Sequence, residues 1–220
     1  MTDYTRQRAW FDPSTVNAAA TIVGCGGIGS FTAFALAKLG VQKLRLVDFD
    51  TVDEHNVPNQ LFNPDQLGQS KVAALSDNLQ AATGIQAVAV RAPLQEGIPR
   101  SPIVVSALDS MAARAALWQQ VRYKLDVNLF LDGRLAGEHI VLYSVDPNDP
   151  ADVVGYEATL HSDAEGEDLP CTARSIIDVG FAVGSLITRA VRRHYARERS
   201  TPMVYLNQQT LRLFTGGWSA

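Results

Sequence analysis

Apolar and polar positions follow two alternating patterns along the first two-thirds of the chain. Short apolar runs are typical of buried strands, and they occupy residues 21–23, 44–47, 87–90, 103–106 and 129–131. Helical spacing of apolar residues lies between these runs, at residues 28–39, 71–82 and 111–124. This alternation predicts an α/β fold, with a Rossmann-like, mostly parallel sheet and helices on both faces.

The pattern changes in the last third. Residues 138–145 predict one more strand, whereas 147–170 are rich in Pro, Asp, Glu and Gly and predict an irregular connection. Residues 173–199 predict a long helix whose first half is apolar on most sides and whose last turns carry arginines, favoured there by the helix dipole. Residues 203–206 and 211–214 predict a closing antiparallel hairpin.

A chain of 220 residues is long enough to fold as one domain. The patterns divide that domain into an N-terminal arm (1–18), a nucleotide-binding core (19–145), a crossover loop (146–170) and a C-terminal helix with hairpin (171–220).

Composition narrows the class of protein. An apolar content of 46% and a charged content of 19% are those of a globular protein, and a net charge of −4 argues against a nucleic-acid partner. No apolar run reaches the roughly 18 residues of a membrane span, and the first residues form no signal peptide. The two cysteines, Cys25 and Cys171, predict neither a disulfide framework nor a zinc site. These features predict a cytoplasmic protein without membrane association.

Glycines mark a nucleotide-binding turn near the start of the core. Gly24, Gly26, Gly27 and Gly29 follow an apolar strand and open a helix, so that the backbone and the helix N-terminus can approach phosphates. Asp48 ends the next strand, about 20 residues further on, where a carboxylate can bind ribose hydroxyls.

Polar residues continue past Asp48, at Asp50, Asn56, Asn59, Gln60 and Lys71. A dinucleotide dehydrogenase does not need this extension, which predicts that the phosphates themselves are held for chemistry. Lys71 begins a predicted helix, where its charge opposes the helix dipole, so a functional reason for the lysine is favoured. Cys25, inside the glycine turn, is predicted to be a small buried filler.

These motifs, taken in order, resemble one family. The order is Tyr4-x-Arg6-Gln7, GCGGIGS, LVDFDTVDEHNVPNQ, GQSK, ALDS around Asp109, and PCTA before a long apolar helix. The chain resembles the ThiF/MoeB/HesA family of enzymes that activate ubiquitin-like proteins, over nearly its whole length. A lone glycine motif is shared with many dehydrogenases, but this combination is far more specific.

The resemblance implies a reaction. In the family, the C-terminal glycine carboxylate of a small ubiquitin-like or sulfur-carrier protein, which ends in Gly-Gly, attacks the α-phosphate of ATP. An acyl-adenylate forms, pyrophosphate leaves, and in many members the activated carboxyl passes to a thiol. The resemblance therefore implies an adenylyltransferase that uses ATP and Mg²⁺.

Residue roles follow from the same resemblance. It implies that Asp48 binds the ribose, that Asn56 and Gln60 lie near the phosphates, and that Lys71 neutralises charge as pyrophosphate departs. Asp109 matches the Mg²⁺ ligand, which suits a carboxylate at the carboxyl edge of a parallel strand.

Two further positions concern partners and covalent chemistry. Arg6 matches an arginine that in dimeric relatives reaches the neighbouring subunit's nucleotide, which implies a homodimer. Cys171 lies just before the long helix, whose dipole and Arg174 would favour its thiolate, so a thioester or persulfide role is open beside a structural one. Because the sequence has no Cys-x-x-Cys, the structural zinc of many relatives is expected to be absent.

The chain departs from the family at Asn59, where an arginine is common. A neutral amide cannot replace the charge or the two-pronged geometry of an arginine on phosphate. Arg8 and Arg134 are candidates to take over that role. Two other hypotheses stay open: a catalytically weakened nucleotide-binding subunit of a heterodimer, and an NAD-dependent oxidoreductase.

Overall fold

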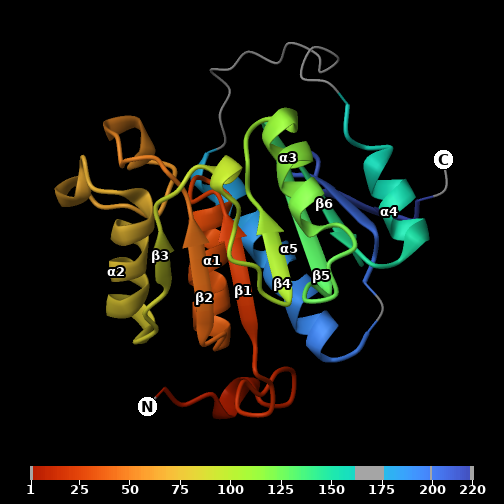
Figure 1. The fold of residues 1–220 in the computed structure, drawn as a ribbon. Coiled ribbons are helices and arrows are strands. Elements are labelled where there is room, and N and C mark those ends of the chain that lie inside the picture. Colours follow the sequence, from red (N-terminus) through yellow and green to blue (C-terminus); the bar gives the residue numbers. More distant parts are fainter. Residues whose placement is uncertain (1, 162–175, 199, 219–220) are drawn as a thin grey trace.

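The computed structural model describes residues 2–161, 176–198 and 200–218 (Figure 1). Its strands are β1 (Ala19–Val23), β2 (Lys43–Val47), β3 (Val88–Val90), β4 (Ile103–Ser106), β5 (Leu129–Ala136), β6 (His139–Val145), β7 (Met203–Asn207) and β8 (Arg212–Gly216). The α-helices are α1 (Gly29–Leu39), α2 (Lys71–Thr83), α3 (Met111–Val121), α4 (Pro150–Glu157) and α5 (Ile177–Tyr195). Each strand and helix predicted from the sequence is present, with ends shifted by a few residues.

The strands form one eight-stranded sheet in the order β3-β2-β1-β4-β5-β6-β7-β8. The pairs from β3 to β5 are parallel, and β6, β7 and β8 add on antiparallel, as the predicted hairpin requires. Helices α1, α2 and α5 pack on one face and α3 and α4 on the other (Figure 1). The prediction of a Rossmann-like, mostly parallel sheet with helices on both faces is confirmed.

Two hydrophobic cores follow from the alternation of side chains along the buried strands. Ile22 and Leu46 point to the layer of α1, α2 and α5, whereas Val23 and Val47 point to α3 and α4. Trp118 is the largest fully buried side chain in the second layer and packs edge-on against Tyr156 of α4, with ring centroids 4.7 Å apart. Burying apolar side chains on both faces makes these central strands nearly continuous apolar runs.

One part of the predicted irregular connection is wrong, because helix α4 lies inside residues 147–170. Asp149 caps this helix by accepting a hydrogen bond of 2.8 Å from the backbone N–H of Ala151, and Pro150 occupies its first turn. Val153 and Tyr156, three residues apart, bury its inner face. The helix has only eight residues, and only two of them are buried. This apolar pattern is too short to reveal helical periodicity within a segment rich in acidic residues.

Helix α5 also differs from the sequence-based picture. Its apolar side chains cover one face rather than most sides: Val179, Val183 and Ile187 are buried, whereas Phe181 is 55% exposed. Among the described residues, the helix packs against α1, β5 and β6, and its buried side chains lie on the face toward them.

The turn between β1 and α1 requires glycine at two positions. Gly24 has a φ of +91°, and a Cβ on it would lie 2.4 Å from the carbonyl oxygen of Ala107. A Cβ on Gly29 would lie 1.8 Å from the carbonyl oxygen of Gly24. The strand, the turn and the helix therefore touch backbone to backbone.

We expect Gly29→Ala to lower the free energy of unfolding by about 2–3 kcal/mol, because the added methyl group forces rigid backbone apart. Gly26→Ala is the matched control in the same turn, since a Cβ there would make only an ordinary contact, 3.8 Å from the Gln60 amide nitrogen. Urea unfolding with the slope held constant measures both variants. Equal stabilities for the two variants would show that the close approach is not what fixes this turn.

Candidate nucleotide-binding site

The candidate site lies at the carboxyl edge of the sheet, where the strand order reverses. From β1 the chain goes first to β2 on one side and later, through β3, to β4 on the other side. The segments that follow β1 and β4 meet there, because Ala107 donates a backbone hydrogen bond of 2.8 Å to the carbonyl oxygen of Val23. Ligands of open α/β sheets bind at such a switch point.

Asp48 joins the glycine turn to the loop that follows β2. One carboxylate oxygen accepts a 2.7 Å hydrogen bond from the backbone N–H of Cys25, and the other accepts one of 2.8 Å from the backbone N–H of Asp50. Each oxygen of an ionised carboxylate can accept a second hydrogen bond. Asp48 therefore has acceptor capacity left for a ribose hydroxyl at the turn.

Lys71 is a nearly buried cation at the start of α2. Its side chain is 9% exposed, and its ammonium nitrogen lies 3.0 Å from a carboxylate oxygen of Asp50. Ser70, which precedes it, makes no side-chain cap for the helix. An ammonium group has three donors, so a phosphate can share this lysine with Asp50.

The Cys25 thiol is buried within the glycine turn. Burial raises its pKa well above the ordinary value, the charge of Asp48 raises it further, and the charge of Lys71 lowers it. Cys25 itself is fully buried and stays protonated, which confirms its prediction as a buried filler.

Asn56 holds its own loop together. It is buried, and its side-chain oxygen accepts a 2.9 Å hydrogen bond from the backbone N–H of Asp53, as part of a capping box. The side-chain oxygen of Asn56 therefore has a structural hydrogen bond and needs no ligand to satisfy it. The predicted phosphate contact of Asn56 stays a prediction.

Asn59 and Gln60 carry polar atoms without protein partners. The side-chain oxygen of each is buried and makes no hydrogen bond. The Gln60 amide nitrogen also lies 3.8 Å from the position of a Cβ on Gly26, beside the turn. Rotation of either amide by half a turn exchanges an acceptor for two donors, so both side chains can serve a polar ligand. Unpaired buried groups are costly, which favours a bound partner here.

Asp109 is the exposed residue of the otherwise half-buried segment 107–110, between β4 and α3. The neighbouring residues are close to the glycine turn, since the Leu108 nitrogen would be 3.5 Å from a Cβ on Gly24. Across the described ranges, no group of three or more His, Cys, Asp or Glu side chains could hold a metal. A single carboxylate that shares Mg²⁺ with phosphate oxygens and water fits this arrangement, because Mg²⁺ commonly binds in that way.

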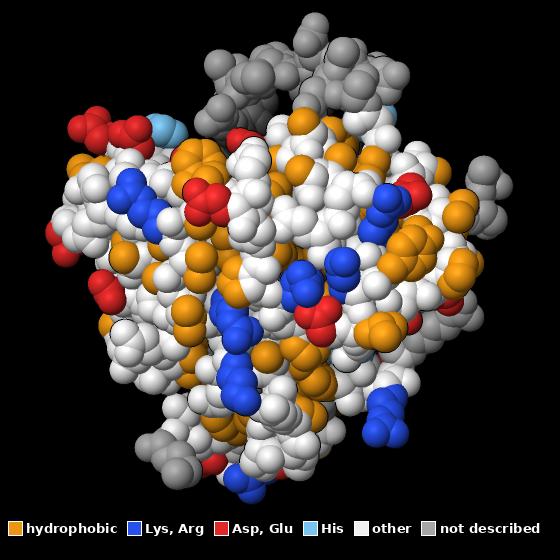
Figure 2. All heavy atoms as spheres, viewed as in Figure 1, with side chains coloured by type: hydrophobic (Ala, Val, Ile, Leu, Met, Phe, Trp, Pro, Cys, Tyr) orange, Lys and Arg blue, Asp and Glu red, His pale blue; other side chains and the backbone are white. Residues whose placement is uncertain are grey.

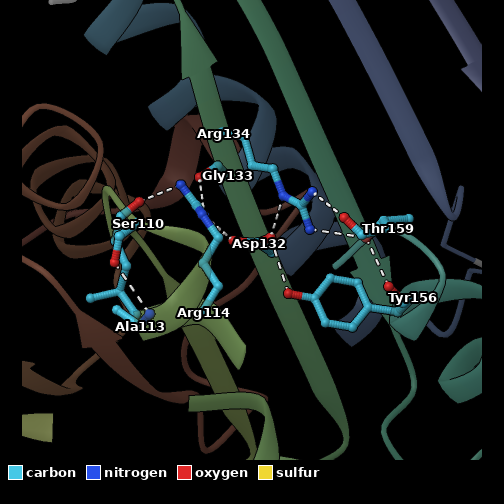
Figure 3. Close-up of polar contacts among 9 residues, drawn as sticks. Ser110, Ala113, Arg114, Asp132, Gly133, Arg134, Tyr156 and Thr159 are labelled. Carbon is cyan, nitrogen blue, oxygen red and sulfur yellow. Dashed lines mark hydrogen bonds and ion pairs between the residues drawn. The ribbon is translucent and has the colours of Figure 1, made fainter. Parts of the chain in front are cut away.

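A buried ion cluster lies behind this edge and was missed by sequence reasoning (Figure 3). Asp132 of β5 is fully buried and pairs with Arg114 of α3 and with Arg134, whose Nε is 2.7 Å from its carboxylate. The Tyr156 hydroxyl donates to the same carboxylate at 3.1 Å. Burial and then the charge of Asp132 raise the pKa of Tyr156 well above its usual value.

Arg134 is therefore committed to structural contacts. Besides Asp132, it donates to the carbonyl and hydroxyl oxygens of Thr159, at 3.0 and 2.9 Å. Although burial alone would lower the pKa of Arg134, the charge of Asp132 raises it. These contacts do not support Arg134 as the replacement for the family arginine at Asn59.

The arginines of the N-terminal arm lie at the opposite end of α1 from the glycine turn. Arg6 is in the short 3-10 helix Thr5–Gln7, and Gln7 donates a 2.7 Å hydrogen bond to the carbonyl oxygen of Leu39, at the C-terminus of α1. Arg8 is exposed, 4.0 Å from Asp12. Neither arginine is brought to its own chain's site. Cys171 and Arg174 lie outside the described residues.

The surface over α3 and α4 has mixed chemistry. Figure 2 shows acidic, basic and apolar side chains interspersed on this face. Among its described residues, this face therefore has no extended region of one charge sign that would attract an oppositely charged partner from a distance. No helix among the described residues is long and apolar enough to cross a membrane.

Known proteins match this chain in sequence over a short stretch. Ubiquitin-like modifier-activating enzyme 5 of Drosophila melanogaster is 49% identical over 61 residues, which are 28% of this chain and 15% of that protein. The enzyme of the same name from Dictyostelium discoideum is 43% identical over 65 residues, which are 30% of this chain and 17% of that protein. The matches thus span less than a fifth of these relatives.

Solved structures share the fold over most of the chain. The crystal structure of PaaA has a TM-score of 0.74 at 16% identity and covers 98% of this chain and 74% of that one. E. coli MccB with ATP has a TM-score of 0.72 at 18% identity and covers 92% of this chain and 64% of that one. The ThiF family model matches residues 14–208, which include the glycine turn, Lys71 and Asp109. The predicted resemblance is confirmed, and the chain belongs to the ThiF family.

Proposed function

We propose that this protein is an ATP- and Mg²⁺-dependent adenylyltransferase. Its substrate is the C-terminal glycine carboxylate of a small ubiquitin-like or sulfur-carrier protein that ends in Gly-Gly. The observation that carries the proposal is the nearly buried Lys71, whose ammonium nitrogen lies 3.0 Å from Asp50. Asp50 is in turn bonded through its backbone N–H to Asp48, which binds the glycine turn. Membership of the ThiF family and the names of the relatives support the same activity.

Each side chain has a defined task in this reaction. The glycine turn lets backbone N–H groups approach the phosphates, and Asp48 accepts hydrogen bonds from the ribose. A carboxylate oxygen of the partner attacks the α-phosphorus, the bond from that phosphorus to the bridging oxygen breaks, and pyrophosphate leaves with the electron pair. Lys71 stabilises the negative charge that builds up on the leaving group.

Asp109 is the proposed ligand for Mg²⁺, which when bound neutralises phosphate charge. None of the ion pairs found among the described residues uses Asp109, so no salt bridge there competes with the proposed metal. The proposed thioester at Cys171 rests on the family resemblance and on the place of this cysteine in the sequence, just before the long helix.

The proposal includes a homodimer. Arg6 lies at the far end of α1 from its own glycine turn, so a role at a nucleotide requires a second copy to supply it. Two-fold dimers exchange equivalent residues in this way, each copy completing the site of the other.

A catalytically weakened nucleotide-binding subunit is the second candidate function. Asn59 favours it, because this position carries a neutral amide with an unpaired buried oxygen and Arg134 is bound to Asp132. Such a subunit would bind ATP and would need a homologous partner subunit for activation.

We expect ATP–pyrophosphate exchange that depends on a Gly-Gly-ended small protein, tested with a panel of such proteins. Lys71→Ala should reduce this exchange by roughly a hundredfold or more, as expected when a group that stabilises transition-state charge is removed. Lys38→Ala is the control, because Lys38 bonds the carbonyl oxygen of Ala82 on the surface. Thermal unfolding checks that both variants fold.

Titration with NAD as well as ATP tests the oxidoreductase alternative, which tight NAD binding would support.

We expect Asn59→Arg to increase the exchange rate by at least about tenfold, because a phosphate-binding arginine can contribute a thousandfold or more. Asn59→Gln, which keeps a neutral amide, should leave the rate within about twofold. If Asn59→Arg brings no gain and a second homologous subunit restores activity, the heterodimer hypothesis replaces the homodimer.

We expect mixtures of two inactive variants to regain activity. Arg6→Ala and Lys71→Ala homodimers each lack one component of every site, whereas a mixed dimer contains one complete site. Random subunit exchange at equal amounts then restores about one quarter of the wild-type sites. A mixture of Lys71→Ala with Lys71→Met is the control and should stay inactive. Absence of recovery in mixtures whose mixed dimers are demonstrated by mass would contradict action of Arg6 across the dimer.

A further inference from the structure

The Arg114–Asp132–Arg134 cluster is not used by the proposed reaction. Two guanidinium groups share one fully buried carboxylate, so the three side chains have a formal charge of +1 (Figure 3). Buried ion pairs contribute little net stability, because desolvation of the charges offsets their attraction. Such a cluster instead fixes the relative positions of the segments that it joins, because each guanidinium group binds its acceptors in fixed directions.

Arg114 links two segments of the candidate site. It donates to the Asp132 carboxylate and, at 3.0 Å, to the carbonyl oxygen of Gly133, both on β5. Its other terminal nitrogen donates to the carbonyl oxygen of Leu108, the residue before Asp109. The segment between β4 and α3 is thereby tied to β5, one residue away from the proposed Mg²⁺ ligand.

The same segment has little freedom on its other side. A Cβ on Gly24 would lie 2.4 Å from the carbonyl oxygen of Ala107, so the segment lies directly against the glycine turn. Ser110 caps α3 by accepting a 3.2 Å hydrogen bond from the backbone N–H of Ala113. The residues on both sides of Asp109 are therefore fixed: Ala107 by its contact with Gly24, Leu108 by Arg114, and Ser110 by its role as the helix cap.

We propose that Arg114, anchored on Asp132, is a positioning residue that holds Asp109 where a divalent cation meets the nucleotide phosphates. This inference rests on the proposed function. A lysine cannot replace Arg114, because one ammonium group cannot reach acceptors on two sides in the planar geometry of a guanidinium. The charge of Asp132 keeps the guanidinium group of Arg114 in place. Asp132 is itself held by Arg134 and by the Tyr156 hydroxyl.

The chain provides two matched controls. Arg122, near the end of the same helix, forms an ion pair of 2.8 Å with Glu157 at the surface. Arg134 shares Asp132 with Arg114, but its remaining contacts go to Thr159 rather than to the Asp109 segment. Lysine substitutions at these positions therefore perturb α3 and the cluster, respectively, without releasing the Leu108 carbonyl group.

The experiment measures the affinity of Mn²⁺, as a spectroscopic substitute for Mg²⁺, in the presence of ATP by electron paramagnetic resonance. Arg114→Lys should weaken Mn²⁺ affinity about tenfold, because residues that orient a metal ligand typically contribute ten- to a hundredfold. AMP lacks the β- and γ-phosphates, and its affinity without metal should stay within about twofold of the wild type. Arg122→Lys and Arg134→Lys should both bind Mn²⁺ within about twofold of the wild type.

Each outcome decides the proposal. Unchanged Mn²⁺ affinity in folded Arg114→Lys, or an equal loss in Arg134→Lys, would overturn the positioning role. If Arg114→Lys does not fold, the variant Asp132→Asn takes its place, because it keeps the two carbonyl contacts of Arg114 but removes its charged partner. A threefold or greater loss of Mn²⁺ affinity in Asp132→Asn supports the positioning role, and a smaller loss or none overturns it. A wild-type protein that binds neither AMP nor Mn²⁺ with ATP would refute the proposed function instead.

Discussion

The close backbone contact between β1, the glycine turn and the segment after β4 is the constraint on which the site depends. Gly24 and Gly29 have no room for side chains, because the carbonyl oxygens of Ala107 and Gly24 occupy that space. This contact holds α1 with its first turn directed at the carboxyl edge of the sheet, where the strand order reverses. Every polar group of the candidate site is placed relative to that edge: Asp48 binds the turn through the Cys25 N–H, and Asp109 follows the segment that touches Gly24.

Electrostatic links extend this arrangement outward from the turn. Asp48 bonds the backbone of Asp50, and Asp50 in turn pairs with Lys71 and accepts its backbone N–H at 3.0 Å. The lysine at the start of α2 is thus aligned by backbone as well as by charge, although its position opposes the helix dipole. The arrangement costs helix stability but places a cation beside Asp50, in the loop that Asp48 joins to the turn, which is a common compromise at functional sites.

The sequence predicted those features that depend on local pattern. Strands and helices with strong periodicity, and the glycine turn, followed from residues close together in the chain. Helix α4 was missed because only Val153 and Tyr156 bury its inner face. The Arg114–Asp132 pair was missed for a different reason: the partners are 18 residues apart on α3 and β5, and only the fold reveals that they meet. The sequence also suggested Arg134 as a substitute for the family arginine, whereas the structure shows that it is bound to Asp132 and Thr159.

The cations of the site differ in how freely they can respond to a triphosphate. Asp132 is fully buried and has two arginines and a tyrosine on its carboxylate, so neither arginine can leave without stranding a buried charge. Asp50 is 48% exposed, so under the proposed function it can turn toward water and leave Lys71 to a phosphate. A pair of this kind exchanges partners at low cost, since the released carboxylate is solvated. The positive charge around Asp132 therefore maintains the geometry of the fold, whereas Lys71 is free to change partners in the proposed reaction.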